Sequence, residues 1–208
     1  MASALPEQTN AGTAQSVIPA AALPPVPPTE MDPFLDAAAR CFARHGIRRT
    51  SVPDIAREAS TSRTTVYRQV GTVDTAAALL LARDLHRLLI SLRGDLDGTD
   101  GPESLIRLVG AVISFCAAHP VLRKVLTDEP EIALAFLTAE FRSIIDRVSD
   151  VVVPLLERAM DDGKIRPGNP RVLADFLVRI TVSVLLSPPP GELSDFLEQV
   201  VLPAIGPV

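Results

Sequence analysis

The chain of 208 residues is 47% hydrophobic and 22% charged, but only 4% of its residues are aromatic and it has no Trp. A core built mainly from Ala, Leu, Val and Ile favours packed helices. The formal net charge of −5 argues against nucleic-acid binding through overall charge. No stretch reaches about 18 uninterrupted apolar residues and the amino terminus has no signal-peptide pattern, so we expect neither a membrane span nor export from the cytoplasm.

The charge is unevenly distributed along the chain. Residues 31–93 carry ten Arg against six acidic residues, giving +4, whereas residues 94–208 carry ten basic and seventeen acidic residues, giving −7. Between residues 40 and 70, seven Arg face only Asp54 and Glu58. A local basic region therefore adjoins an acidic body.

The chain is predicted to begin with a disordered tail. Residues 1–30 are rich in Ala and Pro, hold six prolines and lack hydrophobic periodicity. Order is expected from Asp32, acting as an N-cap, and Pro33, which fits a first helical turn. Apolar residues then follow at helical spacing up to Gly46, which predicts the end of the first helix.

Two short helices are predicted next. Ser51 starts one, with Asp54 three residues on as a capping pair. Ser62 caps the other, which carries Val66 and Val70 on one side. Helices this short are unstable alone and must pack on each other.

The rest of the chain is also predicted to be helical, because no convincing strand alternation appears. A longer helix runs from about Val73 to Leu92 and is followed by a loop, GDLDGTDGP, over residues 94–102. Proline, glycine and asparagine then divide the chain into further predicted helices: 102–118, a short segment over 121–126, 130–162 with a kink at Pro154 and an end at Gly163, 170–186, and 192–204.

The stretch TSRTTVYRQV, residues 61–70, has the composition of a DNA-reading helix. At 100° per residue, Thr64 and Arg68 lie roughly opposite the two valines, with Thr65 and Tyr67 on the flanks. Arg can bridge guanine acceptors or phosphates, and hydroxyl groups can meet phosphate oxygens. The same pattern also fits a plain solvated surface. The order of the preceding short helices favours a helix-turn-helix, in which the third helix enters a groove.

The segment FLDAAARCFARHGIRRTSVPDIAREASTSRTTVYRQVGTVDTAAALL, residues 34–80, resembles the DNA-binding domain of the tetracycline-repressor (TetR) family of bacterial transcription regulators. The likeness lies in CFARHG at the end of the first helix, in Thr50-Ser51-Val52 at the start of the second, and in the recognition helix. By this resemblance we expect seven residues to meet DNA: Thr50, Ser51, Arg63, Thr64, Thr65, Tyr67 and Arg68.

Three positions depart from the family pattern. Ser60 stands where the family usually has glycine in the turn, and serine tolerates a left-handed conformation less well. Val70 replaces a phenylalanine. In the family, the helix after the recognition helix commonly begins with a lysine that contacts phosphate. This lysine is replaced around Val73, so one expected phosphate contact is missing.

The resemblance implies an all-α chain with a tail over 1–30, a helix-turn-helix domain over 31–72, and a larger helical effector-binding and dimerisation domain over 73–208. The last two helices would form the homodimer interface, and a two-fold dimer would bind a palindromic double-stranded operator. The protein would be a repressor released by a small, apolar effector. Candidate pocket residues are Phe115, Cys116, His119, Phe136, Leu137 and Phe141, although aromatic residues at helical spacing also fit a plain core and His119 also fits a plain helix end.

Two other function classes compete with this one. An enzyme is not expected, because the three histidines lie on separate elements and no nucleophile motif, metal-ligand spacing or phosphate-binding loop appears, so we expect no catalytic residue, cofactor or metal site. Cys41 and Cys116 are interpreted as small buried hydrophobes. The stronger alternative is a helical dimer of the same kind that binds a small molecule or a protein without binding an operator.

Overall fold

The computed structural model describes residues 25–96 and 101–206, and within them the regular structure is entirely helical, as the sequence predicts. Of residues 92–96 it describes the backbone. The elements are the 3-10 helix η1 (Thr29–Met31) and the α-helices α1 (Asp32–His45), α2 (Val52–Glu58), α3 (Arg63–Val70), α4 (Val73–Leu96), α5 (Pro102–Ala118), α6 (Pro120–Asp128), α7 (Pro130–Asp161), α8 (Pro170–Leu186), α9 (Leu193–Val200) and α10 (Leu202–Ile205).

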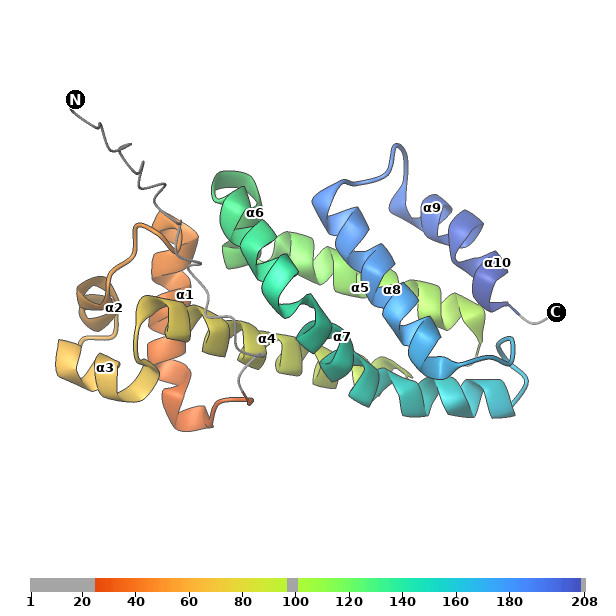
Figure 1. Ribbon diagram of the computed structural model, residues 1–208, viewed down its shortest axis with the longest axis horizontal. Coiled ribbons are helices and arrows are strands. Elements are labelled where there is room, and N and C mark those ends of the chain that lie inside the picture. The colour runs from red at the N-terminus through yellow and green to blue at the C-terminus, as the bar shows by residue number, and fades with distance from the viewer. Residues whose placement is uncertain (1–24, 97–100, 207–208) are drawn as a thin grey trace, which may run out of the picture.

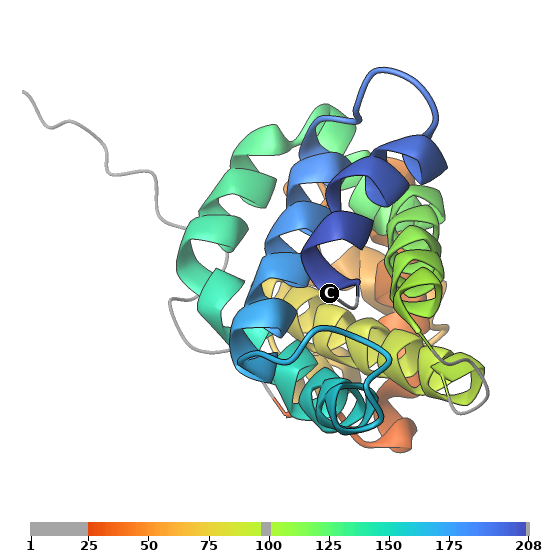
Figure 2. The ribbon, with the colours of Figure 1, turned by 90° about the vertical axis from the view of Figure 1, so that its right-hand side faces the viewer.

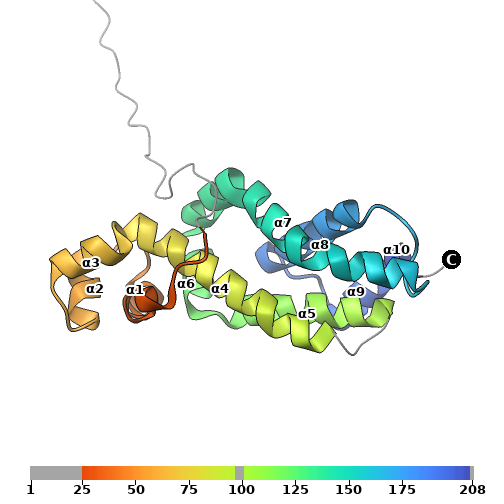
Figure 3. The ribbon, with the colours of Figure 1, turned by 90° about the horizontal axis from the view of Figure 1, so that it is seen from below.

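The molecule is elongated, with α1–α3 at one end and the carboxyl-terminal helices at the other (Figure 1). Helix α4 starts beside α3 and runs along the molecule to lie next to α5, so it joins the two ends (Figure 3). Figure 2 views the body from its carboxyl-terminal end and shows α5, α7, α8 and the α9–α10 segment packed next to one another. The body is therefore a helical bundle that carries the amino-terminal helices on α4.

Helix α1 begins differently from the prediction. Asp32 is the first residue of the helix rather than its N-cap, because Thr29–Met31 already form a turn before it. Its carboxylate instead pairs with two cations of α4, Arg83 at 3.2 Å and Arg87 at 2.6 Å. Arg83 is buried and also pairs with Asp36 at 2.7 Å, so charged contacts fix α1 on α4. Residues 1–24 of the expected tail lie outside the described residues.

Two further boundaries differ. Helix α4 extends to Leu96, into the segment that was predicted as a loop. The last predicted helix is divided into α9 and α10 at Val201, because Pro203 has no N–H to donate and its ring crowds the preceding turn. Pro154, where a kink was predicted, lies inside α7, which is assigned as a single helix from Pro130 to Asp161.

The described apolar residues form two clusters. The first joins α1–α4 to the start of the body, because Val121 and Val125 of α6 and Ile132 of α7 pack with residues such as Phe42. The second lies among α5, α7, α8, α9 and α10. The amino-terminal helices are thus packed on α6 and α7 as well as on α4.

Within the described residues, no single helix is long and apolar enough to cross a membrane. Helices α5 and α6 reach that length only together, across a bend of 71°.

Candidate nucleic-acid interface and ligand cavity

Helix α3 exposes the polar face that the sequence predicts for a recognition helix. The helix is capped by Ser62, whose hydroxyl oxygen accepts a hydrogen bond from the Thr65 N–H at 3.1 Å. Val66 and Val70 are 0% and 1% exposed and pack in the core, and Thr65 is half-buried. On the other side, four side chains are exposed to solvent: Arg63, Thr64, Tyr67 and Arg68. The face combines two cations with two hydroxyl groups, a set that can bind phosphate and base edges.

The start of α2 contains one residue that the structure places differently. Ser51 is exposed, and its backbone N–H donates to the Asp54 carboxylate at 3.0 Å, which forms the predicted capping box. The pKa of Asp54 is lowered mainly by its hydrogen bonds from Ser51. Thr50, however, is 7% exposed and its hydroxyl donates to the Gly46 carbonyl at 2.7 Å. Thr50 therefore supports the α1–α2 turn and does not offer its hydroxyl to DNA.

The turn between α2 and α3 forms despite the serine at its centre. Ser60 has a φ of +50°, and it is the one non-glycine residue with positive φ among the described residues. The turn is closed by hydrogen bonds from the Ala59 N–H to the Ile55 carbonyl at 2.8 Å and from the Thr61 N–H to the Ala56 carbonyl at 2.9 Å. The departure at Ser60 thus leaves the helix-turn-helix geometry intact, at the cost of a strained backbone.

Four of the seven Arg between residues 40 and 70 are occupied by acidic partners within the described structure. Arg40 and Arg44 both bind Glu58, and these bonds lower the pKa of that carboxyl group. Arg57 pairs with Asp54, and Arg48 pairs with Glu131 of α7.

The other three are exposed and have no ion pair among the described residues: Arg49, Arg63 and Arg68. Arg49 was not singled out from the sequence. The sequence alone does not distinguish Arg49 from the neighbouring arginines, because only the structure shows which of them pair with carboxylates.

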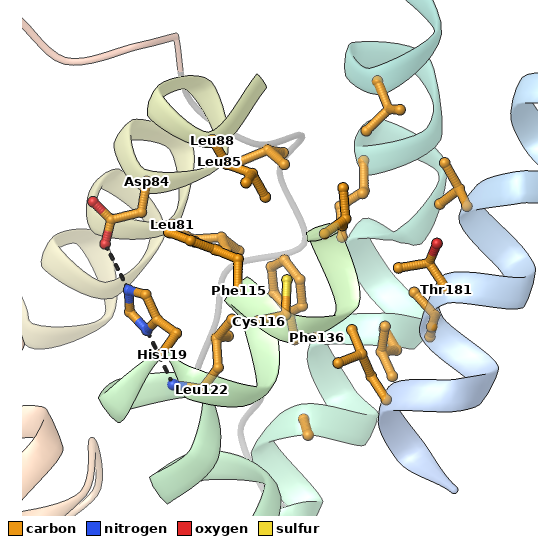
Figure 4. Close-up of a pocket in the computed structure, with 18 of the residues that line it drawn as sticks. Leu81, Asp84, Leu85, Leu88, Phe115, Cys116, His119, Leu122, Phe136 and Thr181 are labelled. Atoms are coloured by element: carbon orange, nitrogen blue, oxygen red, sulfur yellow. Dashed lines mark hydrogen bonds and ion pairs between the residues drawn. The ribbon is translucent and has the colours of Figure 1, made fainter. Parts of the chain in front are cut away.

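A cavity of about 300 Å³ lies in the body between α4, α5, α6, α7 and α8. Figure 4 shows Leu81, Leu85 and Leu88 of α4 on one side of it and Phe136 and Thr181 on the other. The lining is almost wholly apolar; in the described part of the chain its polar members are Asp84, Cys116, His119 and Thr181. Such a space suits an apolar molecule with few polar groups.

Five of the six predicted pocket residues line this cavity: Phe115, Cys116, His119, Phe136 and Leu137. Phe141 does not, because its ring lies under the guanidinium of Arg179 from α8, 5.3 Å from the ring centre. Cys116 is half-buried on the cavity wall rather than in the filled core, and burial raises the pKa of its thiol to about 11. Cys41 is buried, as predicted.

His119 connects three helices at the edge of the cavity (Figure 4). It ends α5 and caps α6, since its Nδ1 accepts from the Leu122 N–H at 3.4 Å. Its Nε2 lies 3.1 Å from a carboxylate oxygen of Asp84 on α4. Burial acts to raise the pKa of Asp84, but the bonds from His119 and Arg83 outweigh it, so the pKa is lowered.

The cavity also reaches the amino-terminal helices. Phe42 at the end of α1 and Ile47 in the α1–α2 turn both contribute to its wall. No sequence pattern indicates this contact, because an apolar residue in a short loop does not show which distant helix it packs against. A molecule that fills the cavity would therefore border the amino-terminal helices as well as the body.

Comparisons with known proteins agree with this arrangement. Residues 34–69 match the family model described as bacterial regulatory proteins, tetR family. An uncharacterized HTH-type transcriptional regulator from Mycobacterium tuberculosis is 28% identical over 154 residues, which cover 74% of this chain and 79% of that protein. By its name, this relative is a transcriptional regulator.

Two solved structures share the fold. A TetR-family transcriptional regulator from Pectobacterium atrosepticum gives a TM-score of 0.64 at 17% identity, covering 84% of this chain and 89% of its own. The TetR family repressor AlkX from Dietzia sp., implicated in biodegradation of n-alkanes, gives a TM-score of 0.62 at 22% identity, covering 83% of this chain and 95% of its own. A helix-turn-helix domain followed by a helical body is therefore a fold common to these proteins.

Proposed function

Since this chain is a TetR-family transcriptional regulator with a helix-turn-helix DNA-binding domain, we propose that it is a dimeric, cytoplasmic repressor that binds a palindromic operator and is released by a small apolar effector. The exposed face of α3 carries the first part of this proposal. Arg63 and Arg68 stand on that face without acidic partners among the described residues, while Val66 and Val70 anchor the helix in the core. Arg49 and Ser51 supply further polar groups at the start of α2.

The apolar cavity carries the second part of the proposal. It offers about 300 Å³ with a wall of Leu, Val, Ile and Phe side chains. AlkX, which shares the fold, is implicated in biodegradation of n-alkanes, and an apolar molecule of that kind suits this lining. An effector releases the operator if it binds more tightly to a conformation in which the two recognition helices no longer match their half-sites.

Exposed apolar residues near the carboxyl terminus support a homodimer. Val172 and Leu186 are 65% and 54% exposed, and they lie on one side of α8 because about four helical turns separate them. Val200 of α9 is 43% exposed. A second copy of the chain packed on α8 and α9 would bury these side chains.

The proposal is tested by selecting bound fragments from the source genome and footprinting the strongest one. We expect a protected palindrome whose half-sites are one DNA turn apart or somewhat more, and an affinity that falls steeply as salt rises, because arginines displace counterions from phosphates. A folded dimer without sequence-selective binding at low salt would contradict the operator claim. That result would favour the alternative, a helical dimer that binds a small molecule or protein only.

A further inference from the structure

Glu129 lies where α6 meets α7, directly against the turn between α1 and α2. Its backbone belongs to both helices: its N–H donates to the Val125 carbonyl at 3.0 Å and its carbonyl accepts from the Ile132 N–H at 2.9 Å. The residue is 4% exposed. A carboxylate so deeply buried is costly unless it is hydrogen-bonded, so its partners explain why it is tolerated there.

Those partners are backbone groups of the DNA-binding domain. One carboxylate oxygen of Glu129 accepts from the Ile47 N–H at 2.7 Å, and the other accepts from the Arg48 N–H at 3.0 Å. Gly46 makes the approach possible, because it has a φ of +83° and a Cβ on it would lie 2.6 Å from the carboxylate. The carboxylate thus holds the α1–α2 turn at two successive amides.

The same contact adjoins the ligand cavity. Ile47 lines the cavity, and so do Val125 and Ile132, whose backbones bond to Glu129. A molecule that displaces these side chains therefore shifts both the carboxylate and the turn that it holds. Charge-assisted bonds of this kind depend strongly on distance and angle, so a small shift weakens them.

We propose that Glu129 is a positioning residue, which holds the DNA-binding domain in its operator-binding orientation. Its hydrogen bonds to the Ile47 and Arg48 amides break when the cavity is filled. This inference rests on the proposed function and adds the element that couples its two sites. Glu129 itself is not among the residues that line the cavity. It acts through the α1–α2 turn, which leads directly into the helix-turn-helix.

The variant Glu129→Gln tests the two hydrogen bonds of the carboxylate without changing the size of the side chain. A neutral amide has one acceptor for two N–H donors, and its NH₂ group opposes the second donor. We expect operator affinity to fall about tenfold or more, because hydrogen bonds to a charged acceptor are stronger than those to a neutral one and the substitution also leaves one N–H without an acceptor. The matched control is Glu131→Gln, which removes the exposed ion pair of Glu131 with Arg48 at 2.8 Å and leaves the hydrogen bonds of Glu129 in place. It should weaken binding less than threefold.

Hydrogen exchange gives a second readout on the protein without a change at Glu129. In a Cys41→Ala background, Cys116 is joined to an apolar chain with hexyl methanethiosulfonate: the thiolate attacks the reagent sulfur, a disulfide forms and methanesulfinate leaves. The raised pKa of Cys116 requires labelling at about pH 9 rather than neutral pH. The chain then occupies the cavity without an identified effector.

Residue-resolved exchange of the Ile47 and Arg48 amides is compared in unlabelled and labelled protein. The proposal predicts at least tenfold faster exchange of these two amides after labelling, with no change at the Val66 and Val70 amides of α3. Unchanged exchange at Ile47 and Arg48 would overturn it, as would equal losses of affinity in Glu129→Gln and Glu131→Gln. If the unaltered protein binds no operator, the proposed function fails, and the exchange comparison still decides the role of Glu129.

Discussion

The two ends of this protein are packed in opposite ways. The helix-turn-helix end fills its interior, with Leu35, Ile55 and Val66 each 0% exposed, and fixes its helices with caps at Ser51 and Ser62. The body keeps a cavity of about 300 Å³ in the middle of its helices. A surface that reads DNA requires fixed side-chain positions, whereas a body that responds to a ligand requires room to rearrange.

The largest expected difference between the ends comes from removing core volume. Ile55→Ala should destabilise the protein by about 2–5 kcal/mol, because it leaves a new void in a filled core. Leu137→Ala, on the cavity wall, should cost less than about 1.5 kcal/mol, because part of that side chain already borders empty space. Urea unfolding at one fixed protein concentration measures both, and equal losses would contradict the difference in packing.

Loss of a DNA contact should be confined to the helix-turn-helix end. Arg68→Ala should weaken specific binding by about 1–3 kcal/mol if Arg68 reads a base, and should act equally on all sequences if it touches phosphate alone. Arg57→Ala is the matched control, because Arg57 is already paired with Asp54 at 3.1 Å. Its loss should change affinity by less than about 1 kcal/mol. Fluorescence anisotropy with specific and scrambled duplexes distinguishes these outcomes, and identical effects of the two variants would argue against Arg68 as a contact.

Adding volume should have opposite signs at the two ends. Ala37→Leu places a larger side chain in the filled core of α1 and should destabilise by about 1–3 kcal/mol. Val112→Leu extends a side chain into the cavity and should stabilise the body by about 0.5–2 kcal/mol. Thermal unfolding of the two variants is the measurement. A destabilised Val112→Leu protein would mean that the cavity has no room for the added methylene group.

The smallest effect is expected at the α2–α3 turn. Ser60→Gly should stabilise the protein by about 0.5–1 kcal/mol, because glycine adopts a φ of +50° without strain and part of the gain is offset by its greater freedom when unfolded. The measurement is again urea unfolding. A loss of stability would show that the serine side chain contributes more than its backbone costs.

The features that were predicted from the sequence depend on neighbours in the chain. The spacing of Val66 and Val70 predicts their burial, and Ser51 with Asp54 predicts a capping box, because both patterns involve residues within one helical turn. Pro130 likewise marks the start of α7. Local rules were sufficient for these elements, whereas α6 begins at Pro120 and ends at Asp128, beyond both bounds of the predicted segment 121–126.

The features that were missed depend on contacts between distant segments. Phe141 fits the pocket pattern, but Arg179 of α8 covers its ring. Glu129 looks like a helix-end acid in sequence, yet its carboxylate binds the Ile47 and Arg48 amides of a distant turn. Thr50 was expected at DNA, but its hydroxyl bonds to a carbonyl four residues earlier. Helical periodicity assigns a face to a residue and does not show what covers that face.

The central claim is that filling the cavity weakens operator binding. The most direct measurement is the affinity of the Cys41→Ala protein for its selected operator, before and after a hexyl chain is attached to Cys116, with a Cys41→Ala/Cys116→Ala protein treated in the same way as the control. We predict that labelling lowers the affinity by about tenfold or more, equivalent to a coupling of about 1.4 kcal/mol or more, while the control is unaffected. Equal affinities of labelled and unlabelled protein, with the label shown to be present by mass, would contradict the claim.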